Sequence, residues 1–152
     1  MTVGQDVHFI TFATRDLDAA RRFYTGGLGW EPLLDVADEI VFFQVAPGTV
    51  LGFFEASRFN QDLGTDRDRS AVSGVTLAHN VGERAEVPEV VAAMVAGGGT
   101  VLVEPQEGDF GGVFHAIVED PNGVVWEVAH NPGWYVDPQG RVSFTGPDPA
   151  GD

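Results

Sequence analysis

Short runs of β-branched and aromatic residues alternate with amphipathic stretches along the chain. Residues 7–13 form the first such run and favour a strand. Apolar side chains then recur at helical spacing over residues 17–24, with Asp16 as the candidate N-cap and Gly26-Gly27 as the stop. Three further strands are predicted at 30–34, 40–45 and 50–55. The first third of the chain is therefore predicted to form a strand, a helix and three strands.

The same order of elements occurs again after a polar stretch. Residues 74–80 match the opening strand, and residues 87–95 carry a helical apolar repeat that Gly97-Gly98-Gly99 ends. Further strands are predicted at 100–104, 113–119 and 124–129. The pattern indicates two βαβββ repeats in tandem.

A repeat with one apolar sheet face hides that face by packing. We therefore expect an α+β fold in which two βαβββ repeats form a cup-shaped mixed sheet with helices outside, as one structural domain. The expected segments are the first repeat at 1–55, a linker loop at 56–73, the second repeat at 74–131 and a tail at 132–152. Trp134, Tyr135 and Phe144 are candidates to dock the tail, and its end is predicted to be loose.

The most informative single stretch is Asp120-Pro121-Asn122-Gly123 followed by a strand that contains Glu127. The four residues have the chemistry of a tight turn. Alternation places Val125, Glu127 and Ala129 on one face of the strand. A carboxylate on an apolar face is costly unless a metal, a base or a cationic ligand meets it. Glu127 is therefore a candidate site residue, and a plain glutamate at a sheet edge is the alternative.

Charge and composition limit the partners. The 23 acidic and 8 basic residues of the 152-residue chain give a formal charge of −15. This charge argues against nucleic acid and anionic membranes as partners. A cationic or neutral small ligand is easier to accommodate.

The chain has no cysteine, which excludes disulfides, thiolate nucleophiles and zinc-finger or iron–sulfur sites. We find no pattern of a signal peptide and no apolar run of membrane-spanning length. The expected location is the cytoplasm. The glycine clusters end helices and do not open them, so they do not form a phosphate-binding loop.

These motifs resemble the vicinal oxygen chelate superfamily, which includes glyoxalase I, bleomycin-resistance and fosfomycin-resistance proteins and extradiol dioxygenases. The resemblance covers about residues 6–131. It rests on the segments Asp16-Leu17-Asp18-Ala19-Ala20-Arg21-Arg22-Phe23-Tyr24, Leu28-Gly29-Trp30, Glu119-Asp120-Pro121-Asn122-Gly123 and Trp126-Glu127. The segments 75–80 and 126–132 resemble a bacterial branch that is usually labelled only glyoxalase-like.

The resemblance implies one divalent metal held by His or Glu from the first and last strands of each repeat. The four implied positions fall on Phe9, near Gly52, on Val75 and on Glu127. Since only Glu127 is of ligand type, the ligand set is too small for Mn, Fe, Ni or Zn. We therefore expect no cofactor. If a metal does bind, its expected ligands are Glu127 and His79.

Strand parity and the resemblance together predict an apolar pocket with few polar groups. The predicted lining residues are Phe9, Thr11, Phe54, Val75, Leu77, His79, Val125 and Glu127. The alternative for His79 is a histidine at a strand end that bonds a loop carbonyl. Which face His115 takes is left open.

Three functions follow from this site. The first is a metal-independent protein that binds or sequesters a cationic or aromatic small molecule, as drug-resistance proteins do. The second is a metal-dependent lyase, isomerase or dioxygenase that uses Glu127 with His79 or His115. The third is a metal-free enzyme with Glu127 as general base. Whether the chain is an enzyme is thus left open, and a homodimer is expected because many relatives dimerise.

Overall fold

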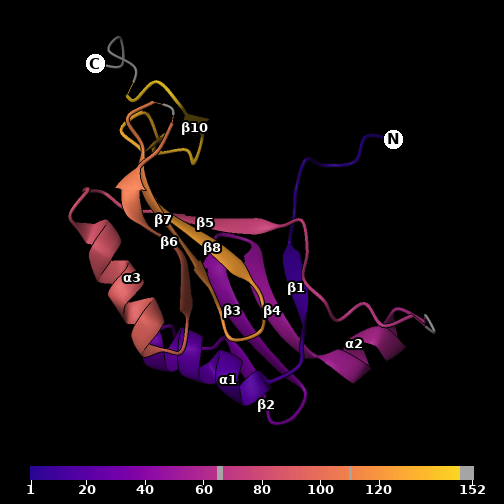
Figure 1. Ribbon diagram of the computed structural model, residues 1–152. Coiled ribbons are helices and arrows are strands. Elements are labelled where there is room, and N and C mark those ends of the chain that lie inside the picture. The colour runs from indigo at the N-terminus through magenta and orange to yellow at the C-terminus, as the bar shows by residue number, and fades with distance from the viewer. Residues whose placement is uncertain (65–66, 110, 148–152) are drawn as a thin grey trace.

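Two four-stranded sheets form the framework of the protein (Figure 1). The computed structural model describes residues 1–64, 67–109 and 111–147. The first sheet has the order β1-β4-β3-β2, from β1 (Phe9–Thr14), β2 (Leu34–Val36), β3 (Ile40–Ala46) and β4 (Thr49–Glu55). The second has the order β5-β8-β7-β6, from β5 (Thr76–Asn80), β6 (Thr100–Glu107), β7 (Phe114–Glu119) and β8 (Val125–His130). The α+β fold with two βαβββ repeats is confirmed.

Each repeat places its helix on one face of its own sheet. In the first repeat, α1 (Leu17–Arg21) continues into the π-helical turn η1 (Arg22–Gly27) and packs on β3 and β4. In the second, α3 (Glu86–Ala96) packs on β6, β7 and β8. Asp16 caps α1 as predicted, because its side chain accepts a 2.9 Å hydrogen bond from the amide of Ala19. We call the covered faces the helix faces and the opposite ones the open faces.

Strand alternation decides which residues belong to which face. Parallel pairing of β1 with β4 puts Phe9 beside Val50 and Thr11 beside Gly52, on the open face of the first sheet. In the second sheet Ala78 pairs with Glu127, also on the open face, whereas His79 pairs with Val128 on the helix face. Val128 is fully buried, so the helix face carries the core.

The two helix faces share one core, and its centre is aromatic. Tyr24 is fully buried there, with ring centroids of Phe53 at 4.4 Å, Phe23 at 4.8 Å and Trp30 at 5.4 Å. Trp126 of the second repeat adds a ring at 6.2 Å. A cluster that takes rings from both repeats joins them into one hydrophobic core.

A chain of buried hydrogen bonds runs through this cluster. The indole of Trp126 donates to the Tyr24 hydroxyl at 3.0 Å, and that hydroxyl donates to the Asp120 carboxylate at 2.7 Å. The second carboxylate oxygen accepts from the amides of Asn122 and Val124. Burial raises the pKa of Asp120 above its usual range, and these hydrogen bonds oppose that shift. Burial and the nearby carboxylate raise the pKa of Tyr24 as well, which keeps its hydroxyl a donor.

The Asp-Pro-Asn-Gly turn also fixes the second repeat to the first. Asn122 accepts a 2.8 Å hydrogen bond from the amide of Asp16 and donates one of 2.8 Å to its carbonyl. Gly123 adopts φ +94°, which explains the glycine at that position. The turn residues therefore serve the contact between repeats as well as the β7–β8 hairpin.

Several boundaries differ from the predictions. The predicted linker contains the helix α2 (Ala56–Asp62), whose first amides are capped by the Glu55 carboxylate. The strand predicted at 30–34 is wrong in its start, because β2 begins at Leu34 and Trp30 instead packs into the aromatic cluster. Apolar and β-branched residues suit either a strand or a core position, so composition did not separate them.

The tail folds back on itself. It forms a short hairpin of β9 (Tyr135–Val136) and β10 (Val142–Ser143), and the rings of Trp134 and Phe144 lie 5.9 Å apart. The end predicted to be loose, residues 148–152, lies outside the described residues. Within the described ranges, none of the helices is long and apolar enough to cross a membrane.

Candidate functional site

Glu127 meets His115 on the open face of the second sheet. The β7–β8 register pairs Ile117 with Glu127 and His115 with Ala129, so the two side chains are diagonal neighbours on one face. The Nδ1 atom of His115 lies 3.0 Å from Oε2 of Glu127. The side chains are 25% and 37% exposed, so the pair is reachable from solvent. The sequence left the face of His115 open, and the register settles it.

The contact between Glu127 and His115 could have been predicted from the position of the Asp-Pro-Asn-Gly turn. The ladder pairs Glu119 with Val125 directly across the Asp-Pro-Asn-Gly turn. Counting outward from that pair in steps of two puts Glu127 opposite Ile117 and one diagonal step from His115. The register of this hairpin, counted outward from its turn, is the sequence signal that the predictions above did not use.

A pocket of about 320 Å³ surrounds the Glu127–His115 pair. Its apolar wall comes from the tail, where Trp134 and Phe144 contact each other. Asn80 and Asn131 add amide groups, and Asn131 also accepts a hydrogen bond from the amide of Gly133 that helps to hold the tail. We call this cavity the carboxylate pocket.

The pair has two chemical uses. When His115 is protonated, the contact is an ion pair, and when it is neutral, Nδ1–H donates to the carboxylate. Either form orients the Glu127 carboxylate and leaves its other oxygen for a ligand. A carboxylate held beside an imidazole is also a pair of groups between which a proton can move. The arrangement therefore suits cation binding or proton transfer.

The residues present do not fit a divalent metal. Among the described residues, no group of three or more His, Cys, Asp and Glu side chains lies close enough to hold one. Glu127 and His79, the two ligands expected if a metal binds, point to opposite faces of the second sheet. They cannot share an ion, because neighbouring positions along paired strands alternate in direction. That pairing was wrong.

Phe9, Thr11 and Phe54 lie on the open face of the first sheet, as their parity predicts. Phe9 is 56% exposed and its ring contacts that of Phe42 edge-on at 5.5 Å. A Cβ added to Gly52 would lie 3.0 Å from the Phe42 ring. The ring thus occupies the space over the position that the resemblance assigns to a metal ligand, and the face is apolar.

The eight predicted lining residues do not share one cavity. Val125 and Glu127 lie on the open face of the second sheet, and Val75 is exposed just before β5. Leu77 and His79 lie on the helix face, because Leu77 pairs with Trp126. The expectation of a single cup was wrong for these two, since parity within β5 does not give its register against β8.

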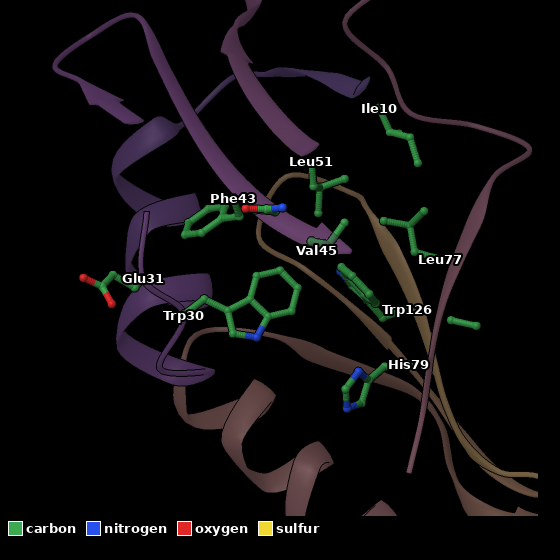
Figure 2. Close-up of a pocket in the computed structure, with 11 residues that line it drawn as sticks. Ile10, Trp30, Glu31, Phe43, Val45, Leu51, Leu77, His79 and Trp126 are labelled. Atoms are coloured by element: carbon green, nitrogen blue, oxygen red, sulfur yellow. The ribbon is translucent and has the colours of Figure 1, made fainter. Parts of the chain in front are cut away.

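Leu77 and His79 instead line a second and larger cavity between the repeats, which Figure 2 shows. Its other walls include Trp30, Phe43 and Trp126. We call it the inner cavity. None of these three aromatic residues was among the predicted lining residues.

The chain is similar to one known protein family. The family model described as Glyoxalase/Bleomycin resistance protein/Dioxygenase superfamily matches residues 6–128. A comparison with curated proteins finds no match.

Several solved structures are also similar to this chain. A glyoxalase-related enzyme from Fulvimarina pelagi is 35% identical, with a TM-score of 0.83 over 91% of this chain and 97% of that one. Lactoylglutathione lyase from Agrobacterium tumefaciens is 23% identical, with a TM-score of 0.64 over 84% and 95% of the two chains. A glyoxalase/bleomycin resistance protein/dioxygenase family enzyme from Burkholderia phytofirmans PsJN is 18% identical, with a TM-score of 0.70 over 81% and 96%. The last two show a likeness of fold alone.

Proposed function

The chain belongs to the Glyoxalase/Bleomycin resistance protein/Dioxygenase superfamily, and from that premise we propose that it binds a cationic or aromatic small molecule in the carboxylate pocket. The observation that carries the proposal is the contact of Glu127 with His115 at 3.0 Å beneath Trp134 and Phe144. It combines one oriented charge with aromatic walls. Such a combination is typical of small-molecule sites.

Charge supports a cationic ligand. The formal charge of −15 attracts cations over the whole surface, and the Glu127 carboxylate supplies a local partner. Trp134 and Phe144 offer ring faces, which attract cations as well as flat apolar groups. An anionic ligand would be repelled both by the net charge of the chain and by the Glu127 carboxylate. We expect sequestration without a metal as the simplest activity of such a pocket.

A panel of basic and aromatic compounds tests the proposal by thermal shift, followed by calorimetry on the hits. A hit should bind once per chain, and Glu127→Gln should weaken a cationic hit at least tenfold by removing the charge that it pairs with. Glu104→Gln is the matched control, because Glu104 is an exposed carboxylate on β6 that does not line the pocket. A flat panel, or equal losses in the two variants, would remove the support for this function.

A second candidate is a metal-free enzyme in which Glu127 takes a proton from a carbon next to a carbonyl group. The contact with His115 favours it, because the imidazole can relay the proton away from the carboxylate. Incubation in deuterated water with simple uncharged ketones and hydroxyketones should then show exchange by NMR. The exchange should disappear in Glu127→Gln and persist in Glu104→Gln. Equal exchange in both variants would exclude Glu127 as the base.

We further propose that the protein is a homodimer. Strands β1 and β5 lie at the edges of their sheets, which leaves backbone groups for pairing with another chain. Phe9 on β1 and Val75 just before β5 are 56% and 47% exposed, so apolar surface accompanies each edge. Light scattering at micromolar concentration should give twice the chain mass of 16.2 kDa. A monomer mass would overturn this proposal.

The cytoplasm remains the proposed location, on the composition without cysteine. Fractionation of the native host with an antibody against the chain tests it. Recovery with an extracytoplasmic fraction would contradict it.

A further inference from the structure

The inner cavity lies on the helix faces, on the opposite side of the second sheet from Glu127. Its walls come from both repeats: Phe43 and Leu51 from the first sheet, Leu77 and Trp126 from the second, and Trp30 from the segment after η1. It has a volume of about 670 Å³, within the range of small-molecule sites. The proposed function makes no use of it.

The cavity exists because the helical segments cover only one end of the helix faces. The end of η1 and the end of α3 meet closely, since a Cβ added to Gly27 would lie 2.8 Å from the Cα of Gly97. Ile10, Val45 and Leu51 lie at the other end of the first sheet, near the start of β1, the end of β3 and the start of β4. Neither α1 nor α3 is described in contact with β1, so the helices leave space at that end.

The floor of the cavity is rigid. Phe43 and Leu51 are 2% exposed and Trp126 is 5% exposed, so core packing holds each of them. The Trp126 indole is also fixed by its hydrogen bond to the Tyr24 hydroxyl. A floor of this kind is formed before any ligand arrives, which lowers the entropy lost on binding.

The walls suit a flat aromatic molecule. Trp30 meets Trp126 at a ring distance of 5.8 Å and 82°, and meets Phe43 at 5.7 Å and 66°. These edge-to-face contacts leave ring faces and edges for a further ring. Figure 2 shows Trp30, Phe43 and Trp126 around one space, with Leu51 and Leu77 on its other sides.

His79 supplies a hydrogen-bonding group to the cavity. In Figure 2 its imidazole lies on the side of β5 that faces the two indoles. Unlike His115, it makes no hydrogen bond to another side chain or to backbone within the described residues. Its ring nitrogens are therefore available to one polar group on a ligand.

We propose that the inner cavity binds an uncharged, planar aromatic molecule that makes one hydrogen bond to His79. The apolar floor disfavours any ion, because burial of an unpaired charge is costly. An anion also meets the formal charge of −15 and the Glu31 carboxylate at the outer edge. The second sheet separates this cavity from the carboxylate pocket, because Leu77 and His79 lie on the opposite face from Glu127.

Titration with Nile red, an uncharged planar dye that fluoresces in apolar surroundings, tests occupancy. The dye should bind once per chain and saturate. Val45→Trp should weaken it at least tenfold by filling the space, and it should fold because Val45 is 44% exposed. Val36→Trp is the matched control, since Val36 is 37% exposed on the neighbouring β2 and outside the cavity. Unsaturable binding, full affinity in Val45→Trp, or equal loss in both variants would overturn the proposal.

Competition against the dye tests the role of His79. In the wild type, 2-naphthol should compete about threefold to tenfold better than naphthalene, which is the usual effect of one neutral hydrogen bond. His79→Leu should remove this preference and retain naphthalene. Glu104→Gln should leave both affinities unchanged, because Glu104 is exposed on β6 and lines neither cavity. A preference that survives His79→Leu would show that His79 does not bind the hydroxyl.

Discussion

The hydroxyl of Tyr24 donates a 2.7 Å hydrogen bond to the carboxylate of Asp120, and this contact crosses from the first repeat to the second. Both residues are buried, Tyr24 completely and Asp120 to 3% exposure. The same hydroxyl accepts from Trp126, which forms the floor of the inner cavity. One tyrosine therefore links the stability of the core to the shape of a candidate binding site.

Tyr24→Phe should destabilise the protein by at least about 2 kcal/mol. The change leaves the Trp126 indole without its acceptor and one Asp120 oxygen without its donor, both in the core. Urea unfolding at neutral pH measures the loss. Tyr135→Phe is the control, because Tyr135 lies in the tail hairpin and should change the free energy by less than about 0.5 kcal/mol. Equal effects of the two changes would contradict the buried chain.

The pH dependence of stability should report the ionisation of Asp120. Its pKa is raised in the folded protein above the ordinary value of 3.8, chiefly by burial. A raised pKa means that the unfolded chain loses this proton first, so the contribution of Asp120 to stability falls as pH rises from about that value to the folded pKa. The stability advantage of wild type over Asp120→Asn should therefore shrink over this interval and stay constant above it.

Chemical denaturation of both proteins at several pH values between 4 and 7 measures that difference. The variant is its own control for every other carboxylate, including Glu55 and Asp68, whose lowered pKa values act in the opposite direction. A stability advantage of wild type over Asp120→Asn that grows with pH would mean that the pKa of Asp120 is lowered in the folded protein.

Gly27→Ala should be strongly destabilising. The new Cβ would lie 2.8 Å from the Cα of Gly97 and 2.9 Å from the Ala93 carbonyl oxygen, and backbone atoms cannot move aside cheaply. We expect a loss of about 2 kcal/mol or more in the free energy of unfolding. Gly26→Ala is the matched control, because no atom lies within 4 Å of its Cβ position. It should be neutral or slightly stabilising, and a similar loss in both would refute the close contact.

Calorimetry on chelator-stripped protein with Mn, Fe, Ni, Co and Zn should give no tight, Glu127-dependent binding. The set of metal ligands is too small, because Glu127 contacts His115 but His79 lies on the opposite face of the second sheet. The titration is repeated on Glu127→Gln. Binding of one ion per chain that disappears in this variant would contradict the expectation, and substrate screens would then follow glyoxalase and dioxygenase chemistry.

Local chemistry predicted the elements well where it was unambiguous. Asp16 caps its helix, and the turn at residues 120–123 leads into a strand on which Glu127 alternates with the buried Trp126 and Val128. Predictions that required one strand to be placed against another were weaker. Leu77 and His79 went to the wrong face because parity within their own strand does not give its register against β8.

The sequence by itself determined the two βαβββ repeats, because turn residues and apolar periodicity act over a few neighbouring positions. It also determined the acidic charge and the carboxylate at Glu127. Tertiary structure decided what Glu127 touches, since His115 reaches it only through the β7–β8 register. It also decided that Trp30, Trp126 and His79 surround one cavity. Those contacts depend on how the two repeats pack, and no local pattern encodes a distance between segments that are far apart in the chain.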